Sequence, residues 1–227
     1  MKIITNIVKR LPRINKLLIK LMLRAHNYSY RVTSLLSQFL EKDGLHPKHR
    51  LIRYHEWFTS RLKKEWTVLD IGCGNGALTY DLKTKCTFVY AIDQNPTNIS
   101  IAKQKYYCNG IKYLCGDATS YNFDIKFDAI ILSNVLEHIT NRVEFLRSIY
   151  YNQNSQNAPI LLLRVPMITR DWITLYKKEM GVEYRLDKTH IIEYCFDELQ
   201  SELKQAELEL VEYEINFGEF YGVVKKI

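Results

Sequence analysis

The sequence of 227 residues lacks any apolar run of the roughly 18 to 20 residues that a membrane-spanning helix needs. Its five cysteines are scattered and include no Cys-x-x-Cys pair, which argues against a disulfide framework. No small-residue cleavage site follows the N-terminal apolar positions, so a secretory signal peptide is not expected. These absences favour a cytoplasmic protein that is soluble or at most peripheral to a membrane.

Acidic residues are scarce in the first part of the chain. Residues 1–64 contain 15 Lys and Arg against 3 Asp and Glu, which is +12, whereas the remainder contains 17 against 22, which is −5. Apolar positions at helical spacing between lysines and arginines predict a basic amphipathic helix over 3–23, kinked or divided at Pro12. Further helices are expected over 31–41 and 48–64. We therefore expect a basic helical extension and cap over 1–64 and one catalytic domain over 65–227.

Strand and helix patterns alternate from residue 66 onward, which is typical of a parallel sheet covered by helices on both faces. Only three residues, 217–219, separate the last two strands, and this is too short for a parallel crossover. We expect an α/β, Rossmann-like sheet of seven strands, mostly parallel with an antiparallel last strand. The strands are predicted over 67–71, 88–93, 111–114, 127–133, 160–165, 208–216 and 220–225, and helices over 76–82, 97–108, 140–151, 172–180 and 196–206.

A glycine-rich loop follows the first predicted strand in the run Asp70-Ile71-Gly72-Cys73-Gly74-Asn75-Gly76. Glycine permits a tight turn and lets a ligand lie against the main chain. Asp93 closes the next strand, where a Rossmann-like fold places a carboxylate for ribose hydroxyls, and Asp117 follows the third. These carboxylates could instead cap turns. A nicotinamide dehydrogenase is a rival because Ala77 stands where its longer loop needs a third small residue.

With Ser133-Asn134-Val135-Leu136-Glu137-His138-Ile139 after the fourth strand, residues 66–227 resemble the class I S-adenosylmethionine-dependent methyltransferases. The last string is similar to the corresponding motif of the small-molecule branch, including ubiquinone-pathway O-methyltransferases. The resemblance implies S-adenosylmethionine as cofactor, with its methionine part near the glycines, its ribose on Asp93 and its adenine on Asp117. The implied cofactor-binding residues are Asp70, Gly72, Cys73, Gly74, Asp93, Gln94, Asp117, Ala118, Ser133 and Asn134.

Two histidines are candidate catalysts, because transfer to a hydroxyl benefits from a general base with a pKa near neutrality. His138 follows the fourth strand, and either acts as base or orients its loop. His190 precedes the last large predicted helix, where this family often turns a histidine to the acceptor, so it is favoured slightly. Asn134 and Asn141 stand where a hard cation would want carboxylates, so no metal is expected.

The region 46–58 is rich in histidine, cations and aromatic residues, and with 217–224 it is similar to methyltransferases of bacterial surface-polysaccharide and glycolipid biosynthesis. His49, Arg50 and Arg53 are predicted to bind an anionic acceptor. We expect O-methylation of a small-molecule, sugar or lipid-linked acceptor in glycan biosynthesis, with peripheral membrane contact through residues 1–24. The alternatives are an RNA or protein methyltransferase and a non-catalytic cofactor-binding partner protein. Nucleic acid is disfavoured because no Asn/Asp-Pro-Pro-aromatic motif follows the fourth strand.

Overall fold

The computed structural model describes residues 12–41, 46–151 and 158–227, and the chain divides into two compact units. One unit contains residues 1–51 and 171–186, and the other contains 52–170 and 187–227. Residues 171–186, which sequence analysis assigned to the catalytic domain, therefore cluster with the N-terminal residues. The domain boundary expected between residues 64 and 65 remains a prediction.

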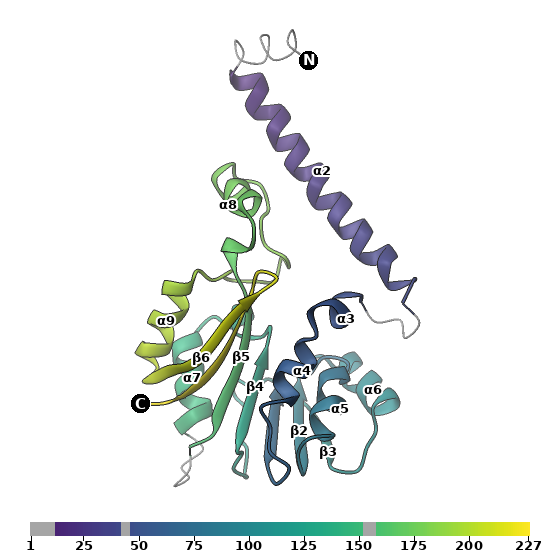
Figure 1. Cartoon of the computed structure of the whole chain (residues 1–227), viewed down its shortest axis with the longest axis vertical. Helices are drawn as coiled ribbons and strands as arrows, with labels where there is room; N and C mark the ends of the chain where they lie inside the picture. Colours follow the sequence, from purple (N-terminus) through teal and green to yellow (C-terminus); the bar gives the residue numbers. More distant parts are fainter. Residues whose placement is uncertain (1–11, 42–45, 152–157) are drawn as a thin grey trace. The chain divides into compact units, whose positions relative to one another are not determined.

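The larger unit contains a seven-stranded sheet in the order β3-β2-β1-β4-β5-β7-β6 (Figure 1). Only β7 runs antiparallel to its neighbours, β5 and β6, as the short link at 217–218 requires. The predicted α/β fold class is therefore confirmed. The strands are β1 (Thr67–Ile71), β2 (Phe88–Asp93), β3 (Ile111–Cys115), β4 (Ala129–Ser133), β5 (Ile160–Pro166), β6 (Leu208–Asn216) and β7 (Glu219–Lys226).

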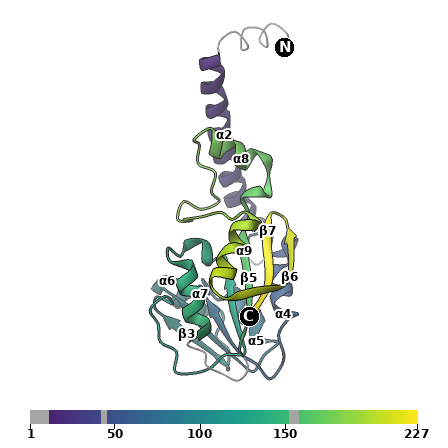
Figure 2. The ribbon, with the colours of Figure 1, turned by 90° about the vertical axis from the view of Figure 1, so that its left-hand side faces the viewer.

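Both faces of the sheet are covered, which explains why the central strands are apolar at almost every position. On one face Val89, Ile131 and Leu162 pack against α4 (Tyr54–Thr59) and α5 (Ala77–Lys83), while α6 (Pro96–Lys105) packs beside them. On the other face Leu132 and Leu163 pack against α7 (Arg142–Tyr151) and α9 (Phe196–Gln205). The result is a three-layer arrangement with the sheet in the middle (Figures 1 and 2).

The N-terminal helices differ from the prediction in two places. One continuous helix, α2 (Pro12–Gln38), replaces the two helices expected over 3–23 and 31–41. Pro12 is the first described residue of this helix, so the kink or division expected at Pro12 stays a prediction. The helix expected over 48–64 is divided into α3 (Lys48–Ile52) and α4, because Arg53 has a φ of 55° and interrupts the helical backbone. The part of the first predicted helix over 3–11 lies outside the described residues.

The smaller unit also contains α8 (Trp172–Glu179), which Figure 2 shows beside α2. The Asn27 side chain donates a hydrogen bond of 2.6 Å to the Glu183 carbonyl oxygen, and Lys177 Nζ lies 3.1 Å from His26 Nδ1. These contacts join segments that are far apart in the sequence. Among the described residues, no helix combines the length and apolar character needed to cross a bilayer.

The close packing between the sheet and the helices predicts that shortening a buried side chain there lowers the stability of the protein. Leu163 is fully buried between β5 and the α7–α9 layer, so Leu163→Ala should lower the free energy of unfolding by about 2 to 5 kcal/mol. Urea unfolding followed by circular dichroism measures this loss. Leu51→Ala makes the same chemical change at a side chain that is 59% exposed, and it should shift stability by less than about 0.5 kcal/mol. Equal losses in both variants would contradict this account of the core.

Candidate active site

The glycine-rich loop connects β1 to α5 at the carboxyl edge of the sheet. Gly72, Gly74 and Gly76 have φ values of 69°, 54° and 87°, in the left-handed region that glycine adopts most readily. A Cβ on Gly72 would lie 2.4 Å from Val135 Cγ2, so the loop also passes too close to the segment after β4 for a side chain. A Cβ on Gly74 would meet no atom within 4 Å, so this stretch of main chain is open to a ligand.

Asp93 ties the end of β2 to this loop. Its Oδ2 accepts a hydrogen bond of 2.9 Å from the Gly74 N–H, while its Oδ1 accepts one of 2.8 Å from the Asn95 N–H. The Asn98 amide also donates to Oδ1, at 3.3 Å. Asp93 therefore organises the loop as well as facing the cavity described below. The turn-capping role and the ligand-binding role considered for this carboxylate are compatible.

A cavity of about 1020 Å³ lies at this edge of the sheet. It exceeds the volume that one small ligand needs, so it has room for a cofactor together with part of an acceptor. Its walls come from the ends of β1, β2, β3 and β4, from α7 and from the loop after residue 186. Of the predicted cofactor-binding residues, those that line it are Gly72, Asp93, Gln94, Asp117, Ala118 and Asn134.

The other predicted cofactor residues adjoin this wall without lining the cavity. They are Asp70, Cys73, Gly74 and Ser133. Asp70 is buried and accepts a hydrogen bond of 2.6 Å from Thr79 Oγ1, and burial raises the pKa of its carboxyl to about 7. Asp70 thus links β1 to α5, and the contact through water that the resemblance implies stays a prediction.

Asp117 and Asn134 have local roles in addition to facing the cavity. Asp117 Oδ1 accepts hydrogen bonds from the N–H and the hydroxyl of Thr119, at 2.9 and 2.8 Å. Asn134 has a φ of 56°, a conformation that asparagine tolerates better than most residues. Its Oδ1 is buried and has no hydrogen-bond partner in the described structure. A buried polar atom that lacks a partner beside a cavity is suited to a ligand that can donate a hydrogen bond.

The segment 187–193 lies against the short 3-10 helix η1 (Leu136–His138). The Ile191 N–H donates a hydrogen bond of 2.8 Å to the Glu137 carbonyl oxygen. This contact brings His190 beside His138, with their ring centroids 4.7 Å apart and the rings edge to face. The two predicted catalytic histidines therefore lie together although 52 positions separate them in the sequence.

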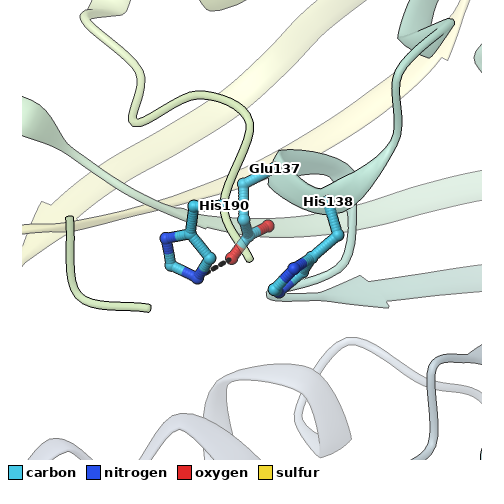
Figure 3. Close-up of side chains that lie close together, drawn as sticks. All are labelled: Glu137, His138 and His190. Carbon is cyan, nitrogen blue, oxygen red and sulfur yellow. Dashed lines mark ion pairs between the residues drawn. The ribbon is translucent and has the colours of Figure 1, made fainter. Parts of the chain in front are cut away.

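Only one of these histidines lines the cavity. His138 belongs to the cavity wall, whereas His190 is buried behind it, 5% exposed. His190 lies near two buried carboxylates, with Nε2 3.9 Å from Glu137 Oε1 and Nδ1 3.4 Å from Glu193 Oε1 (Figure 3 draws the Glu137 pair). Glu193 also pairs with Arg170. The slight preference for His190 as the base rested on its place before the last large helix, and spacing could not show which ring faces the cavity.

Burial determines the protonation states of Glu137 and His138. The Glu137 carboxylate oxygens are buried without hydrogen-bond partners in the described structure, and burial raises the pKa of Glu137 to about 8. Burial, followed by the neighbouring His190, lowers the pKa of His138 below 6.5. His138 is therefore neutral at neutral pH, which is the form that can accept a proton.

Glu137, His138 and His190 each offer a donor atom, and these atoms all lie within 4.8 Å of one another (Figure 3). Two imidazoles with one carboxylate suit zinc or iron better than magnesium. Sequence analysis weighed only Glu137 and His138, because the approach of His190 depends on the tertiary fold. The expectation of no metal stays a prediction.

Two residues that sequence analysis missed lie beside His138 in the cavity wall, Asp187 and Thr189. Thr189 Oγ1 lies 2.8 Å from Asp187 Oδ1 and 3.1 Å from His138 Nδ1. The Thr189 N–H and hydroxyl both donate to Asp187 and lower its carboxyl pKa, so the carboxylate is ionised. The pattern Asp-x-Thr just before His190 is the only sequence signal for this contact, and it is equally typical of an ordinary turn.

The predicted acceptor-binding residues do not line this cavity. Arg50 pairs with Glu41 at 2.8 Å, and Arg53 pairs with Glu56. His49 is in α3, next to Arg50. Their role in binding an acceptor stays a prediction.

The sequence of this chain is similar to a methyltransferase family and to curated methyltransferases. A family model described as a methyltransferase domain matches residues 69–151. The chain is 26% identical over 127 residues to a probable cobalt-precorrin-6B C(15)-methyltransferase (decarboxylating) of Methanocaldococcus jannaschii, covering 55% of this chain and 69% of that protein. It is 34% identical over 86 residues to the mitochondrial ubiquinone biosynthesis O-methyltransferase of Arabidopsis thaliana, covering 36% of this chain but only 27% of that protein.

The fold is also shared with a solved structure, that of magnesium protoporphyrin IX methyltransferase from Synechocystis with bound SAH. The TM-score is 0.60 at 17% identity, and the match covers 79% of this chain and 83% of that one. Residues 69–151 match a methyltransferase domain, and together with the sheet, the glycine loop with its carboxylates and the curated relatives this match supports a class I S-adenosylmethionine-dependent methyltransferase. Its methyl donor is accordingly S-adenosylmethionine.

The geometry around Asp93 leads to a binding prediction. Asp93→Ala removes a carboxylate that faces the cavity and holds Gly74, so it should weaken the binding of S-adenosylhomocysteine by about 10- to 100-fold, since hydrogen bonds to charged groups contribute about 1.5 to 3 kcal/mol. Isothermal titration calorimetry measures the affinity. Asp124→Ala removes an exposed carboxylate outside the cavity and should leave the affinity unchanged. Wild-type affinity in a folded Asp93→Ala protein would refute the role assigned to Asp93.

Proposed function

We propose that this protein transfers the methyl group of S-adenosylmethionine to a hydroxyl of a small-molecule acceptor, with His138 as the general base. The observation that carries this proposal is the hydrogen-bonded series Asp187, Thr189 and His138 in the cavity wall. Bound S-adenosylmethionine would supply an electrophilic methyl group on a sulfonium. The residues of this chain then need to align the acceptor, exclude water and take up the hydroxyl proton.

The Thr189 hydroxyl sets the proton position on His138. It has one proton, which it donates to the ionised Asp187 carboxylate, so its oxygen accepts from His138 Nδ1–H. This contact leaves the lone pair on Nε2, the nitrogen that can take a proton from an acceptor. His190 packs against the His138 ring from the buried side, where it holds the ring in place.

The nature of the acceptor rests on weaker support. The two curated relatives act, by their names, on a precorrin and in ubiquinone biosynthesis, and both are small-molecule pathways. The first is named as a C(15)-methyltransferase, so a hydroxyl acceptor is supported by the His138 arrangement and not by this relative. We propose a sugar or lipid-linked hydroxyl in glycan biosynthesis, consistent with the basic segment 1–64 and with membrane contact by residues 1–24.

The acceptor class can be tested by mass spectrometry. The full chain is incubated with deuteromethyl-labelled S-adenosylmethionine and, separately, with extracted glycolipids, quinone precursors, RNA and protein. Label on a lipid or sugar oxygen supports the proposal, whereas label on RNA or protein alone overturns it. Cofactor binding without transfer to any of these pools would favour a non-catalytic partner protein.

The proton-acceptor role predicts a specific pH profile. Because the pKa of His138 is lowered, the base form is present above that pKa and is lost as the pH falls through it. The acid limb of kcat/KM should therefore have its midpoint below pH 6.5. His138→Gln should lower kcat by about 10²- to 10⁴-fold and abolish this limb, while cofactor affinity stays near the wild-type value.

Matched variants separate catalysis from folding. Thr189→Val removes the acceptor for His138 Nδ1–H and should lower kcat, and Thr189→Ser should restore it. His55→Gln changes a histidine outside the cavity and should leave kcat unchanged. A pH profile that is unaltered in His138→Gln would refute the base role. Activity that is lost with EDTA and restored by zinc would assign the histidine cluster to a metal instead.

A further inference from the structure

Helix α2 exposes a row of large apolar side chains along its length. The exposed fractions of eight of them lie between 43% and 72%. Successive members are separated by one, three, six or seven residues, which places them along one side of a helix. These residues are Ile14, Leu17, Leu18, Leu21, Met22, Tyr28, Leu35 and Leu36, and together they are called the apolar face below.

The apolar face is not the side by which α2 attaches to the rest of its unit. The buried residue of the helix is Leu23, and Asn27 and Ser34, at helical spacing from it, make hydrogen bonds to Glu183 and His46. At about 100° per residue, Leu18 and Leu36 lie on the side of the helix opposite Leu23 and Asn27. The apolar face therefore points away from the contacts that α2 makes within its own unit.

A cationic stripe runs along one flank of the apolar face. Arg13, Lys20, Arg24 and Arg31 follow one another at intervals of seven, four and seven, so they share one side of the helix. Helix α2 contains no Asp or Glu. An occupant of the apolar face must therefore offer apolar surface bordered by negative charge.

We propose that the apolar face of α2 binds the interface of an anionic lipid bilayer. The 27 residues of the helix extend about 40 Å, and a helix that lies in the plane of the interface buries such a face among acyl chains while its cations reach the headgroups. A second copy of the chain fits less well, because it would bring an identical cationic stripe to the same seam, without a carboxylate on either α2 helix to neutralise it.

This inference deepens the membrane contact proposed above and moves it from residues 1–24 to the outward face of α2, as far as Leu36. It does not depend on the base role of His138. Binding to vesicles is measured without an acceptor or a methyl donor, so failure of the membrane proposal and failure of the methyl-transfer proposal give separate results.

The test is sedimentation of the full chain with vesicles. Vesicles of phosphatidylglycerol and phosphatidylcholine should bind the protein at least tenfold more tightly than vesicles of phosphatidylcholine alone, and salt should weaken the binding. The triple variant Leu17→Gln, Leu21→Gln and Leu35→Gln should lower the affinity at least tenfold without changing the net charge. The variant Lys20→Gln, Arg24→Gln and Arg31→Gln should remove most of the preference for phosphatidylglycerol.

Controls keep the result interpretable. Tyr107→Gln with Val211→Gln replaces two exposed apolar side chains outside α2 and should leave vesicle binding unchanged. Circular dichroism and calorimetry with S-adenosylhomocysteine show that each variant is folded. Absence of vesicle binding by the parent protein, or equal binding by the triple leucine variant, would overturn the proposal. A dimer in light scattering that the leucine variant loses would assign the apolar face to a second copy.

Discussion

The site depends on main-chain hydrogen bonds that join the ends of β1 and β2. The N–H groups of Gly72 and Cys73 both donate to the Ile92 carbonyl oxygen, and the Gly74 N–H donates to Asp93. These bonds require a loop that turns back over the sheet with positive φ, and they leave the main chain at Gly74 uncovered. Because parallel strands present their carboxyl ends at one edge, Asp117 and Asn134 reach the same cavity from β3 and β4.

Burial is the second constraint, and it decides the chemistry of the opposite wall. Glu137 is fully buried on η1, which favours its protonated form, while burial and a neighbouring imidazole keep His138 neutral. The segment 187–193 provides Thr189 and His190 through one hydrogen bond from Ile191 to η1. A neutral imidazole in the cavity wall thus results from packing that removes water from ionisable groups, and this is the form that the proposed base role of His138 requires.

Much of the sheet could be predicted from local patterns. The bounds of β1, β2 and β6 agree with the prediction, because each strand is an extended run whose last residues meet a turn or a polar segment. The helices near the N-terminus were harder. Helical periodicity continues from Pro12 to Gln38 without a break, whereas the break at Arg53 is a backbone conformation that no turn residue marks. The antiparallel last strand was predicted from the short link before β7, whereas the strand order was not predicted and is decided by the tertiary structure.

The sequence by itself determined the class of the protein and one wall of its cavity. A glycine loop and the carboxylates that close successive parallel strands must meet at one edge, because parallel pairing leaves them no other place. Only the tertiary structure decided which histidine faces that cavity, that Thr189 and Asp187 adjoin it, and which side of α2 stays exposed. These features depend on contacts between segments distant in the chain, and no local spacing carries that information.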